Sequence, residues 1–490
     1  MTDDRTPVLV GCGQTTQRQP DARAALAPLH LMAHAARLAA ADSGGGAALL
    51  AALDTVVVIR LFVDTSPRFA SPFGRHANLR RSGPASHWPG VMPRPLTPLT
   101  PLQGRRRRRF RALGCRHPRG WSPVEEHHGA RAAITAYPLF ESAIQGALGR
   151  SIGQHQAVMG TLLARFAAVA AANSLSDRRA GYSAAQIAQV APGNPTIAWP
   201  YTRLMCANAF IGQGAALILS SVGQARRLGI PRAKWVFLHG CADAHDHWFV
   251  SDRRDCHSSP AMHRVFDETF RMAGATLADR AAFDIYCCFA SAVQIASAEL
   301  GLAPDDACGL TLTGGLPYFG GPGNHYVTHA IAAMMVRLRA QPGQRGLVNA
   351  NGNCVTKHSA GIYATEPPTQ PFAPVDPARY QAELDRVPRP PFSALASGAA
   401  RIETYTVTHD KTGPRAAPSS SAGWRAAPGT VCASSPTPRC TPACWPACRG
   451  WIFWAVPAAS ATTGGPIPWC RADRRSRPWR ASDCLAGTCA

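Results

Sequence analysis

Two adjacent cysteines stand at the end of a short apolar segment, Phe283-Asp-Ile-Tyr-Cys-Cys-Phe289, just before a stretch with helical periodicity. A thiol at the start of a helix lies close to backbone N–H groups, and the helix dipole lowers its pKa. Only one of two adjacent side chains can face the end of the strand. We predict that Cys288 acts as a nucleophile or a base. The alternative is that both cysteines pack in the core as small apolar residues.

A glycine-rich segment, residues 314–323, follows about thirty residues later. Glycines allow close backbone approach and expose amides that can hold an acyl oxygen or a phosphate. We therefore predict a binding role for Gly314, Gly315, Gly320, Gly321 and Gly323. A purely steric need for glycine in tight turns is the alternative. His325 lies in the first turn of the helix that we expect over residues 324–338.

A third polar segment, Asn351-Gly-Asn-Cys-Val-Thr-Lys-His358, follows the apolar residues 347–349 and is predicted to be a loop. It contains Cys354 and His358. Cysteine and histidine on neighbouring strand-end loops can divide acyl transfer between a nucleophile and a general base. The predicted catalytic set is therefore Cys288, His325, Cys354 and His358.

A second polar cluster spans His239 to Trp248 and includes Asp243, His245, Asp246 and His247. These side chains could ligate a metal or form a hydrogen-bond network. A two-residue histidine spacing on a loop is unspecific, so we favour the network and predict no metal. The sequence contains no Gly-x-Ser-x-Gly elbow, no Walker loop, and no Gly-x-Gly-x-x-Gly after a strand.

The elements around these segments predict an α/β fold. Continuous β-branched and apolar runs favour buried strands of a sheet that is covered on both faces. We expect strands over residues 7–14 (running into a glycine turn), 54–62, 214–220, 234–239 and 401–408, and helices over 27–41, 134–172 (one helix or two), 183–190, 222–228 and 377–385.

Two segments break this pattern, residues 80–120 and 414–490. Arg, Pro, Ala, Ser, Cys and Trp dominate them, as in GC-rich coding sequence read in a wrong frame. Our hypothesis is that each results from a frameshift; the alternative is a pair of disordered basic linkers. Of the net charge of +22, residues 65–124 supply +13 and residues 414–490 supply +7, so about +2 remains for the rest.

This charge distribution argues against a nucleic-acid-binding face, which would cover one surface of a folded domain. The reading as a basic nucleic-acid-associated protein stays open only if both segments are ordered. No apolar run reaches eighteen residues, so no transmembrane helix is expected. The acidic start, Met1-Thr-Asp-Asp-Arg5, lacks the features of a secretory signal, and the cysteines outside the tail show no framework spacing. We expect a cytoplasmic protein.

The order of these pieces resembles the thiolase superfamily, in the branch of the sterol carrier protein X thiolase. Residues 8–15 resemble the opening strand of that family, residues 137–173 its helical loop domain, and residues 212–219 its Asp-Gly-Ala-Ala-Ala strand, with Gln213 in place of Asp. The resemblance covers Pro7 to Leu79 and Trp121 to Thr408. It implies two similar halves stacked in α-β-α-β-α layers with a helical loop domain, the first half being incomplete.

The resemblance also implies acetyl-CoA acetyltransferase activity on acyl-CoA thioesters, with no permanently bound cofactor and with a homodimer as one expectation. Several motifs differ from the family. Its His-Asp-Cys-Phe reads Tyr286-Cys-Cys-Phe289, and its Gly-His-Pro reads Gly320-Gly-Pro322. The nucleophilic cysteine of the family should fall within residues 80–120. Cys115 lies there without a predicted strand or helix around it, so we transfer no role to it. We therefore expect an altered active site; the alternative is a non-catalytic acyl-CoA or lipid-binding protein.

The expected domains follow from these boundaries. Residues 1–79 form the first part of the N-terminal half, and residues 121–270 form the helical loop region with the rest of that half. Residues 271–413 form the C-terminal half. Residues 80–120 and 414–490 are the anomalous segments.

The frameshift hypothesis is tested by resequencing the coding DNA across the codons for residues 80–120 and from residue 413 onward. We expect single-base changes that restore alternating strand and helix patterns with a normal content of acidic residues. Alternate frames that give no orderly α/β continuation would refute the hypothesis.

Overall fold

The computed structural model describes residues 2–18, 24–59, 78–80, 120–130, 132–303, 306, 309–392, 400–410, 413–414, 431–434 and 451–457. Most of the two anomalous segments, Cys115 and the end of the strand predicted over 54–62 lie outside these ranges.

The first sheet pairs β1 (Pro7–Gln17) with β6 (Gly212–Ser221) in antiparallel fashion. Helix α1 (Pro28–Asp42) lies across both strands. Gly11 and Gly13 allow this close approach, because a Cβ on either glycine would lie 2.2 Å from a backbone oxygen of α1. In the described part of the chain this sheet has two strands.

The second sheet has four strands in the order β7-β10-β9-β8. Strand β8 is parallel to β9, and β10 runs antiparallel to both β9 and β7. The bounds are Phe237–His245 for β7, Arg280–Asp284 for β8, Arg345–Gly352 for β9 and Lys357–Ala364 for β10. Helix α8 (Pro260–Ala273) packs on β7 and β10, and α9 (Ala290–Leu300) packs beside α8.

The two sheets repeat one local irregularity. Val10 is bulged in β1 and His239 is bulged in β7, each immediately before a glycine. The glycines, Gly11 and Gly240, both lie against the outer helix, where a Cβ would come 2.2 Å from a helix carbonyl oxygen. The same order of strand, bulge, glycine and covering helix in both places shows that the halves are structurally related.

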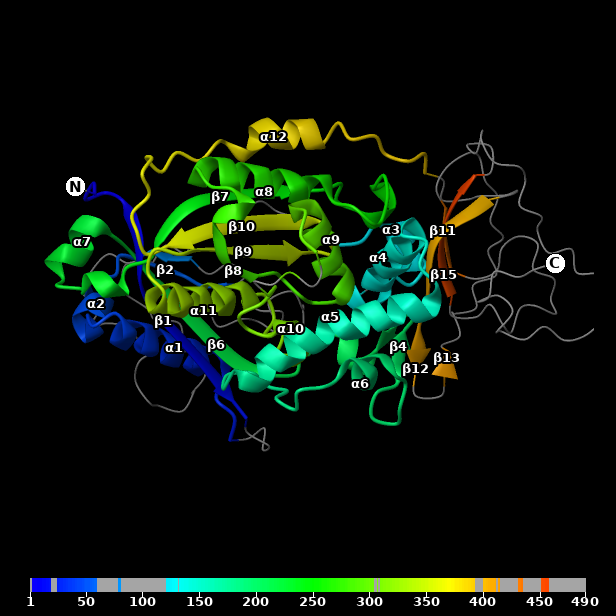
Figure 1. Ribbon diagram of the computed structural model, residues 1–490, viewed down its shortest axis with the longest axis horizontal. Helices are drawn as coiled ribbons and strands as arrows, with labels where there is room; N and C mark the ends of the chain where they lie inside the picture. Colours follow the sequence, from blue (N-terminus) through cyan, green and yellow to red (C-terminus); the bar gives the residue numbers. More distant parts are fainter. Residues whose placement is uncertain are drawn as a thin grey trace, which may run out of the picture.

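Helix α11 (Tyr326–Ala340) lies between the two sheets and contacts strands of both. The strands meet directly where Leu9 and Val236 exchange two backbone hydrogen bonds of 2.8 and 2.9 Å. From one side to the other the layers are α8 with α9, the four-stranded sheet, α11, the β1–β6 sheet and α1 (Figure 1). This arrangement confirms the predicted α-β-α-β-α fold.

The helical loop region lies beside these layers (Figure 1). It contains α3 (Pro123–His127), α4 (Ala133–Ala147), α5 (Ile152–Ala172) and α6 (Ala184–Ala188). Reciprocal capping boxes start three of these helices, with Ser122, Ser151 and Ser183 as the capping residues. The long helical pattern over 134–172 is therefore a pair of helices, separated at residues 148–151.

The remaining elements are short or peripheral. They are α2 (Gly46–Ala52), β2 (Thr55–Val57), β3 (Asn78–Arg80), β4 (Thr196–Ala198), β5 (Tyr201–Thr202), α7 (Val222–Arg227), α10 (Gly315–Tyr318), α12 (Pro377–Leu384), β11 (Ala400–Val407), β12 (His409–Asp410), β13 (Gly413–Pro414), β14 (Val431–Ser434) and β15 (Trp451–Pro457).

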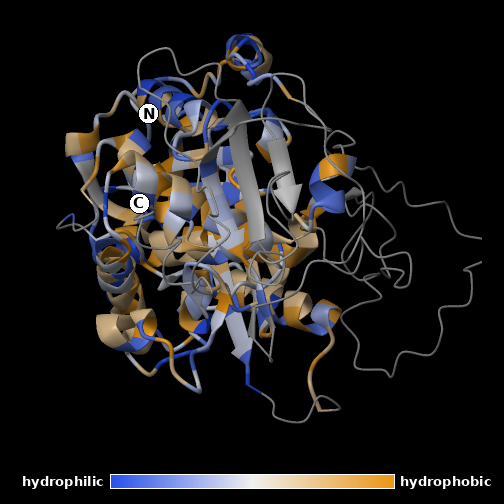
Figure 2. Ribbon diagram, turned by 90° about the vertical axis from the view of Figure 1, so that its right-hand side faces the viewer, coloured by the Kyte–Doolittle hydropathy of each residue, from blue (hydrophilic) through white to orange (hydrophobic). Residues whose placement is uncertain are grey.

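Many helices carry both hydrophobic and hydrophilic residues, as the orange and blue colours on the same ribbons show (Figure 2). In α8 the buried residues recur every three or four positions, as in Met262, Val265, Phe266 and Thr269. No helix in the described ranges is long and apolar enough to cross a membrane.

Two predicted local structures are wrong. His358 was expected on a loop but lies in strand β10, where it pairs with both neighbouring strands. The cluster around Asp243 and His245 is likewise part of a strand, because β7 continues to His245. The four-stranded sheet therefore begins at β7, upstream of residue 271.

Replacing Gly240 with Ala tests the close contact between β7 and α8. The new methyl group would press on the carbonyl oxygen of Thr269, so we expect the free energy of unfolding to fall by about 1–3 kcal/mol. Gly153→Ala is the matched control, because open space surrounds Gly153 in α5, and it should be neutral or slightly stabilising. Equal effects of the two substitutions in urea denaturation would contradict this packing.

Candidate functional site

Strand β8 delivers the cysteine pair to the start of α9. After Asp284 the chain is held by three hydrogen bonds: Ile285 N–H to the Leu310 carbonyl at 2.8 Å, Tyr286 N–H to Asn349 Oδ1 at 2.7 Å and Leu316 N–H to the Cys287 carbonyl at 2.9 Å. Cys287 is fully buried and lies against Gly315. Cys288, which is 6% exposed, instead contacts Tyr137 of α4.

The buried carboxylate of Asp284 fixes the start of the glycine-rich segment. Its Oδ2 accepts hydrogen bonds from the backbone N–H groups of Leu312 (2.9 Å) and Thr313 (3.0 Å). The same oxygen accepts from the hydroxyls of Thr311 and Thr313. Its Oδ1 accepts from the Tyr326 hydroxyl of α11 at 3.2 Å. One side chain thus joins β8, the segment before Gly314 and the central helix.

The predicted binding glycines have clear steric roles. Gly314, Gly315, Gly320 and Gly323 adopt positive φ values, from 62° to 126°. A Cβ on Gly314 would contact Ala170 of α5 at 2.5 Å, and one on Gly320 would contact Ile211 at 2.0 Å.

Several of their amides are also hydrogen bonded within the chain. Gly314 N–H donates to the Thr311 hydroxyl, Gly315 N–H to the Thr313 hydroxyl, and Gly321 N–H to the Asn208 carbonyl. The structure therefore explains the glycines by backbone geometry, and a role in holding an acyl oxygen or a phosphate stays a prediction.

Cys354 lies in an unusual turn between β9 and β10. Three consecutive non-glycine residues, Asn353, Cys354 and Val355, have φ values of 53°, 56° and 57°. This left-handed conformation costs roughly 1–2 kcal/mol for each residue, and it is rarest for a β-branched side chain such as valine. Such strain persists only where surrounding contacts enforce it, and it is typical of functional sites.

The Cys354 and Cys288 thiols are both buried in the region around Tyr137. The two groups interact electrostatically, and both interact with the Tyr137 hydroxyl. Tyr137 OH is hydrogen bonded to Cys288 and accepts from Asn351 Nδ2 at 3.2 Å. The Tyr137 ring stacks on Phe289 with 4.6 Å between centroids. These residues come from α4, the start of α9, the end of strand β9 and the β9–β10 turn.

The expected lowering of the thiol pKa is wrong. Burial raises the pKa of Cys288 to about 12, and hydrogen bonds from Tyr137 and the backbone lower it only in part. Burial also raises the pKa of Cys354, although the Arg253 charge opposes the effect. Both thiols are therefore protonated at neutral pH, because desolvation outweighs the helix N-terminus.

His325 lies at the other end of the glycine-rich segment, next to the first sheet. Its ring is 5.5 Å from that of His329, whose Nδ1 is 2.8 Å from Gln14 Oε1. Burial lowers the pKa of His325, and burial together with the nearby His325 lowers that of His329 well below its usual value. None of the hydrogen bonds or ring contacts found among the described residues joins His325 to Cys288 or Cys354.

His358 takes part in a buried network at the start of α8. Its Nε2 is 3.1 Å from Asp246 Oδ2 and 3.2 Å from the Ser259 hydroxyl. Ser259 caps the helix by accepting from Met262 N–H, and Asp246 accepts from Ala261 N–H. Burial raises the pKa of Asp246, but the hydrogen bond and charge of His358 outweigh this effect and lower it. His358 thus stabilises the α8 terminus and reaches the turn only through the Val355 carbonyl, 3.2 Å away.

The other members of the His239–Trp248 cluster are also hydrogen bonded. His245 Nδ1 contacts the Asp246 carbonyl, and His247 Nε2 contacts the Val387 carbonyl at 2.7 Å. Within the ranges that the structure describes, no group of three His, Cys, Asp or Glu side chains is arranged to hold a metal.

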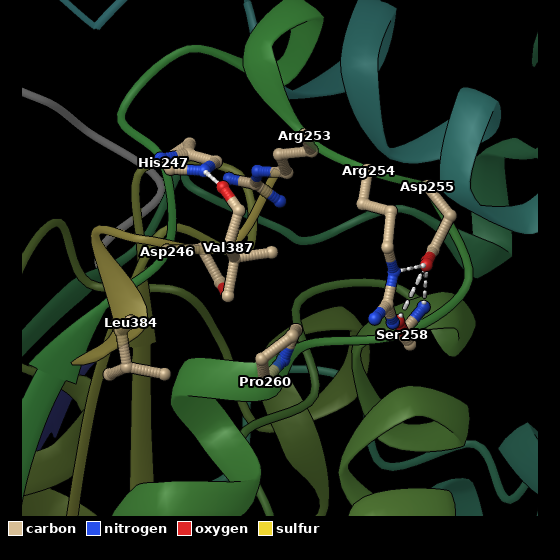
Figure 3. A pocket seen from close by; sticks show the side chains of 9 residues that line it. All are labelled: Asp246, His247, Arg253, Arg254, Asp255, Ser258, Pro260, Leu384 and Val387. Carbon is tan, nitrogen blue, oxygen red and sulfur yellow. Dashed lines mark hydrogen bonds and ion pairs between the residues drawn. The ribbon is translucent and has the colours of Figure 1, made fainter. Parts of the chain in front are cut away.

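Two cavities border this region. One of about 20 Å³ at the start of α8 has room for a single water and is too small for an acyl chain. It is lined by Asp246, His247, Arg253, Arg254, Asp255, Ser258, Pro260, Leu384 and Val387 (Figure 3). The other, of about 140 Å³, is lined mainly by apolar residues: Leu162, Arg165, Phe166, Val169, Gly309, Leu310 and Thr311. Phe166 also contacts Gly315, so this cavity adjoins the glycine-rich segment.

Sequence reasoning did not identify Tyr137, Asn351, Arg253 or Asp284 as site residues. Tyr137 lies on the apolar stripe of a helix, where it cannot be distinguished from a core residue. Asp284 offered a usable signal, because a lone carboxylate within an apolar strand must be hydrogen bonded when it is buried.

Comparisons with known proteins found many similar structures. A structure described as a monomeric SCP2-thiolase like protein type 1 (STLP1) from Mycobacterium smegmatis has a TM-score of 0.69 and 34% sequence identity to this chain. The match covers 84% of this chain and 88% of that one. An Ltp2-ChsH2(DUF35) aldolase has a TM-score of 0.49 and 16% identity over 74% of this chain and 98% of that one, a likeness too low to support an inference. No family model and no curated protein matches the chain.

Substitution of Asp284 tests its role in fixing the glycine-rich segment. Asp284→Ala leaves two buried backbone N–H groups without an acceptor, so we expect a loss of about 3–5 kcal/mol in unfolding free energy. Asp284→Asn keeps one acceptor oxygen for these groups and can donate to Tyr326, so its loss should be about 1 kcal/mol. Chemical denaturation measures both values. Similar losses for Ala and Asn would show that the carboxylate does not act as the acceptor.

Proposed function

Because the chain belongs to the SCP2-thiolase-like proteins, we propose that it binds acyl-CoA thioesters and transfers the acyl group as an acetyl-CoA acetyltransferase with an altered site. One observation carries this proposal. Two thiols, Cys288 and Cys354, converge on the Tyr137 hydroxyl from separate loops of the second half. A pair of thiols on rigid elements suits acyl transfer, where one thiol takes the acyl group and the other moves a proton.

Cys288 is the better candidate for acyl acceptor. The hydrogen bond from Tyr137 stabilises its thiolate and lowers its pKa against the effect of burial. Its sulfur would attack the thioester carbonyl carbon, the carbon–sulfur bond to CoA would break, and the CoA thiolate would leave and take up a proton. The mainly apolar cavity beside Gly315, about 140 Å³ in volume, supports a short acyl chain as the transferred group.

The altered part of the site is the general base. His358 is committed to Asp246 and Ser259, and His325 lies beside His329. In the described residues neither histidine is hydrogen bonded to a thiol, so transfer depends on spontaneous ionisation of Cys288. We therefore propose slow transfer that accelerates at alkaline pH.

A second candidate function is binding of acyl-CoA or lipid without catalysis. The raised pKa of both thiols favours it, because a neutral thiol is a poor nucleophile. A homodimer is expected from the family resemblance. The similar Mycobacterium smegmatis protein is described as monomeric, so a monomer is the competing expectation.

The pH dependence of acylation tests the transfer reaction. The pKa of Cys288 is about 12, so the thiolate fraction should rise about tenfold for each pH unit between pH 7 and 9. Mass spectrometry of the intact protein after incubation with acetyl-CoA measures the rate of acylation, and peptide mapping locates the group.

Two variants serve as controls for this experiment. Cys288→Ala should abolish acylation while leaving CoA binding in calorimetry unchanged, and Cys241→Ala, in strand β7, should change neither. A rate that levels off near pH 7 would contradict the proposed ionisation. CoA binding without acylation at any pH would favour the non-catalytic candidate.

A further inference from the structure

Arg253 connects helix α4 with the Cys354 turn. It follows a short 3-10 helix, Val250–Asp252, and is 7% exposed. Its Nη2 donates to the Cys354 carbonyl at 3.0 Å and also to the Thr356 hydroxyl. Its guanidinium lies over the Phe140 ring of α4, 5.2 Å from the centroid. Two hydrogen bonds and one ring contact thus fix the guanidinium of Arg253 against the turn.

The turn needs such an external support. Gly352 and Lys357 are paired at the ends of β9 and β10, and four residues connect them. Glycine is absent from these four, although three adopt left-handed backbone angles. Within the turn, Thr356 N–H donates to the Gly352 carbonyl, as in any tight turn. The guanidinium adds two hydrogen bonds, which it donates to the Cys354 carbonyl and the Thr356 hydroxyl. Both come from Nη2, which carries two hydrogens.

The charge of Arg253 acts on the same turn. It lowers the pKa of Cys354 against the effect of burial and lowers that of Asp246. Glu125 of α3 and Cys288 also face Cys354, and both oppose ionisation of its thiol. Nε and Nη1 of Arg253 have no hydrogen-bond partner within the described structure, so its hydrogen bonds all run through Nη2 to the turn.

We propose that Arg253 is a positioning residue that holds the left-handed Cys354 turn and so keeps the Cys354 thiol beside that of Cys288. The proposal deepens the acyl-transfer function and rests on it for its biological meaning. Its geometric content is independent, because it concerns the distance between two thiols in the free protein. Arg253 itself touches neither reacting sulfur and is therefore not a catalytic residue.

The neighbouring Arg254 provides a matched control. Its side chain is hydrogen bonded to Asp255 and Ser258 (Figure 3) and not to the Cys354 turn. It is also exposed, so its loss removes the same charge from the same segment without touching the thiols. A comparison of the two arginines therefore separates positioning from a general change in charge.

The test measures bridging of the two thiols by dibromobimane, a small reagent that links only closely spaced sulfurs. The full-length protein is treated under native conditions, and bridged and singly labelled peptides are quantified by mass spectrometry. In Arg253→Met we expect the ratio of bridged to singly labelled Cys288–Cys354 product to fall about tenfold. Arg254→Met should keep the wild-type ratio, and Arg253→Lys, which can hold one acceptor at a time, should give an intermediate ratio.

Each outcome has a definite meaning. An unchanged ratio in Arg253→Met overturns the proposal, as does an absence of bridged peptide in the wild-type protein. If Arg253→Met does not fold, Arg253→Lys decides, and a wild-type ratio in that variant overturns the proposal. CoA binding and acylation are measured on the same variants. Loss of bridging in Arg253→Met therefore supports the positioning role even if the wild-type protein shows no acyl transfer.

Discussion

The buried carboxylate of Asp284 is the constraint on which the geometry of the second half depends. A carboxylate in an apolar interior must be surrounded by donors, and here the donors come from Leu312, Thr313 and Tyr326. Leu312 and Thr313 belong to the segment before Gly314 and Tyr326 belongs to α11, so the need to solvate one charge brings the strand end, the glycine-rich segment and the central helix together. Burial still raises the pKa of Asp284 despite these bonds. The site is therefore built around a group that is costly to bury and is tolerated because all its neighbours converge on it.

Much of the fold could be predicted from the sequence, because the signals involved are local. Buried strands have continuous apolar runs, and helices such as α8 have both a start signal and a periodic stripe. The layered architecture was predicted from the family resemblance and not from local signals. The bulge that precedes both Gly11 and Gly240 is the local feature that the two sheets share. The two errors at His358 and His245 share one cause: polar residues near a turn were assigned to loops, although strands tolerate them where hydrogen bonds are available.

The site could be predicted only in part. The sequence identified both thiols, because strand-to-helix and strand-to-strand junctions can be located from periodicity. It could not show that burial would dominate the pKa of Cys288, since the covering residues, Tyr137 among them, are distant in the chain. Nor could it reveal the contact of Arg253 with Cys354, which spans 101 residues. Three consecutive left-handed residues without glycine have no sequence signal, because their conformation is imposed by tertiary contacts.

In the left-handed turn of Asn353, Cys354 and Val355, the residue that would best stabilise the backbone differs from the residue that supplies a thiol. Glycine at position 354 would relieve the backbone strain and would keep the carbonyl that Arg253 holds. The substitution that would stabilise the fold at position 354 therefore also removes the sulfur. A chain that keeps cysteine here is less stable than one with glycine. Selection for stability alone would remove Cys354.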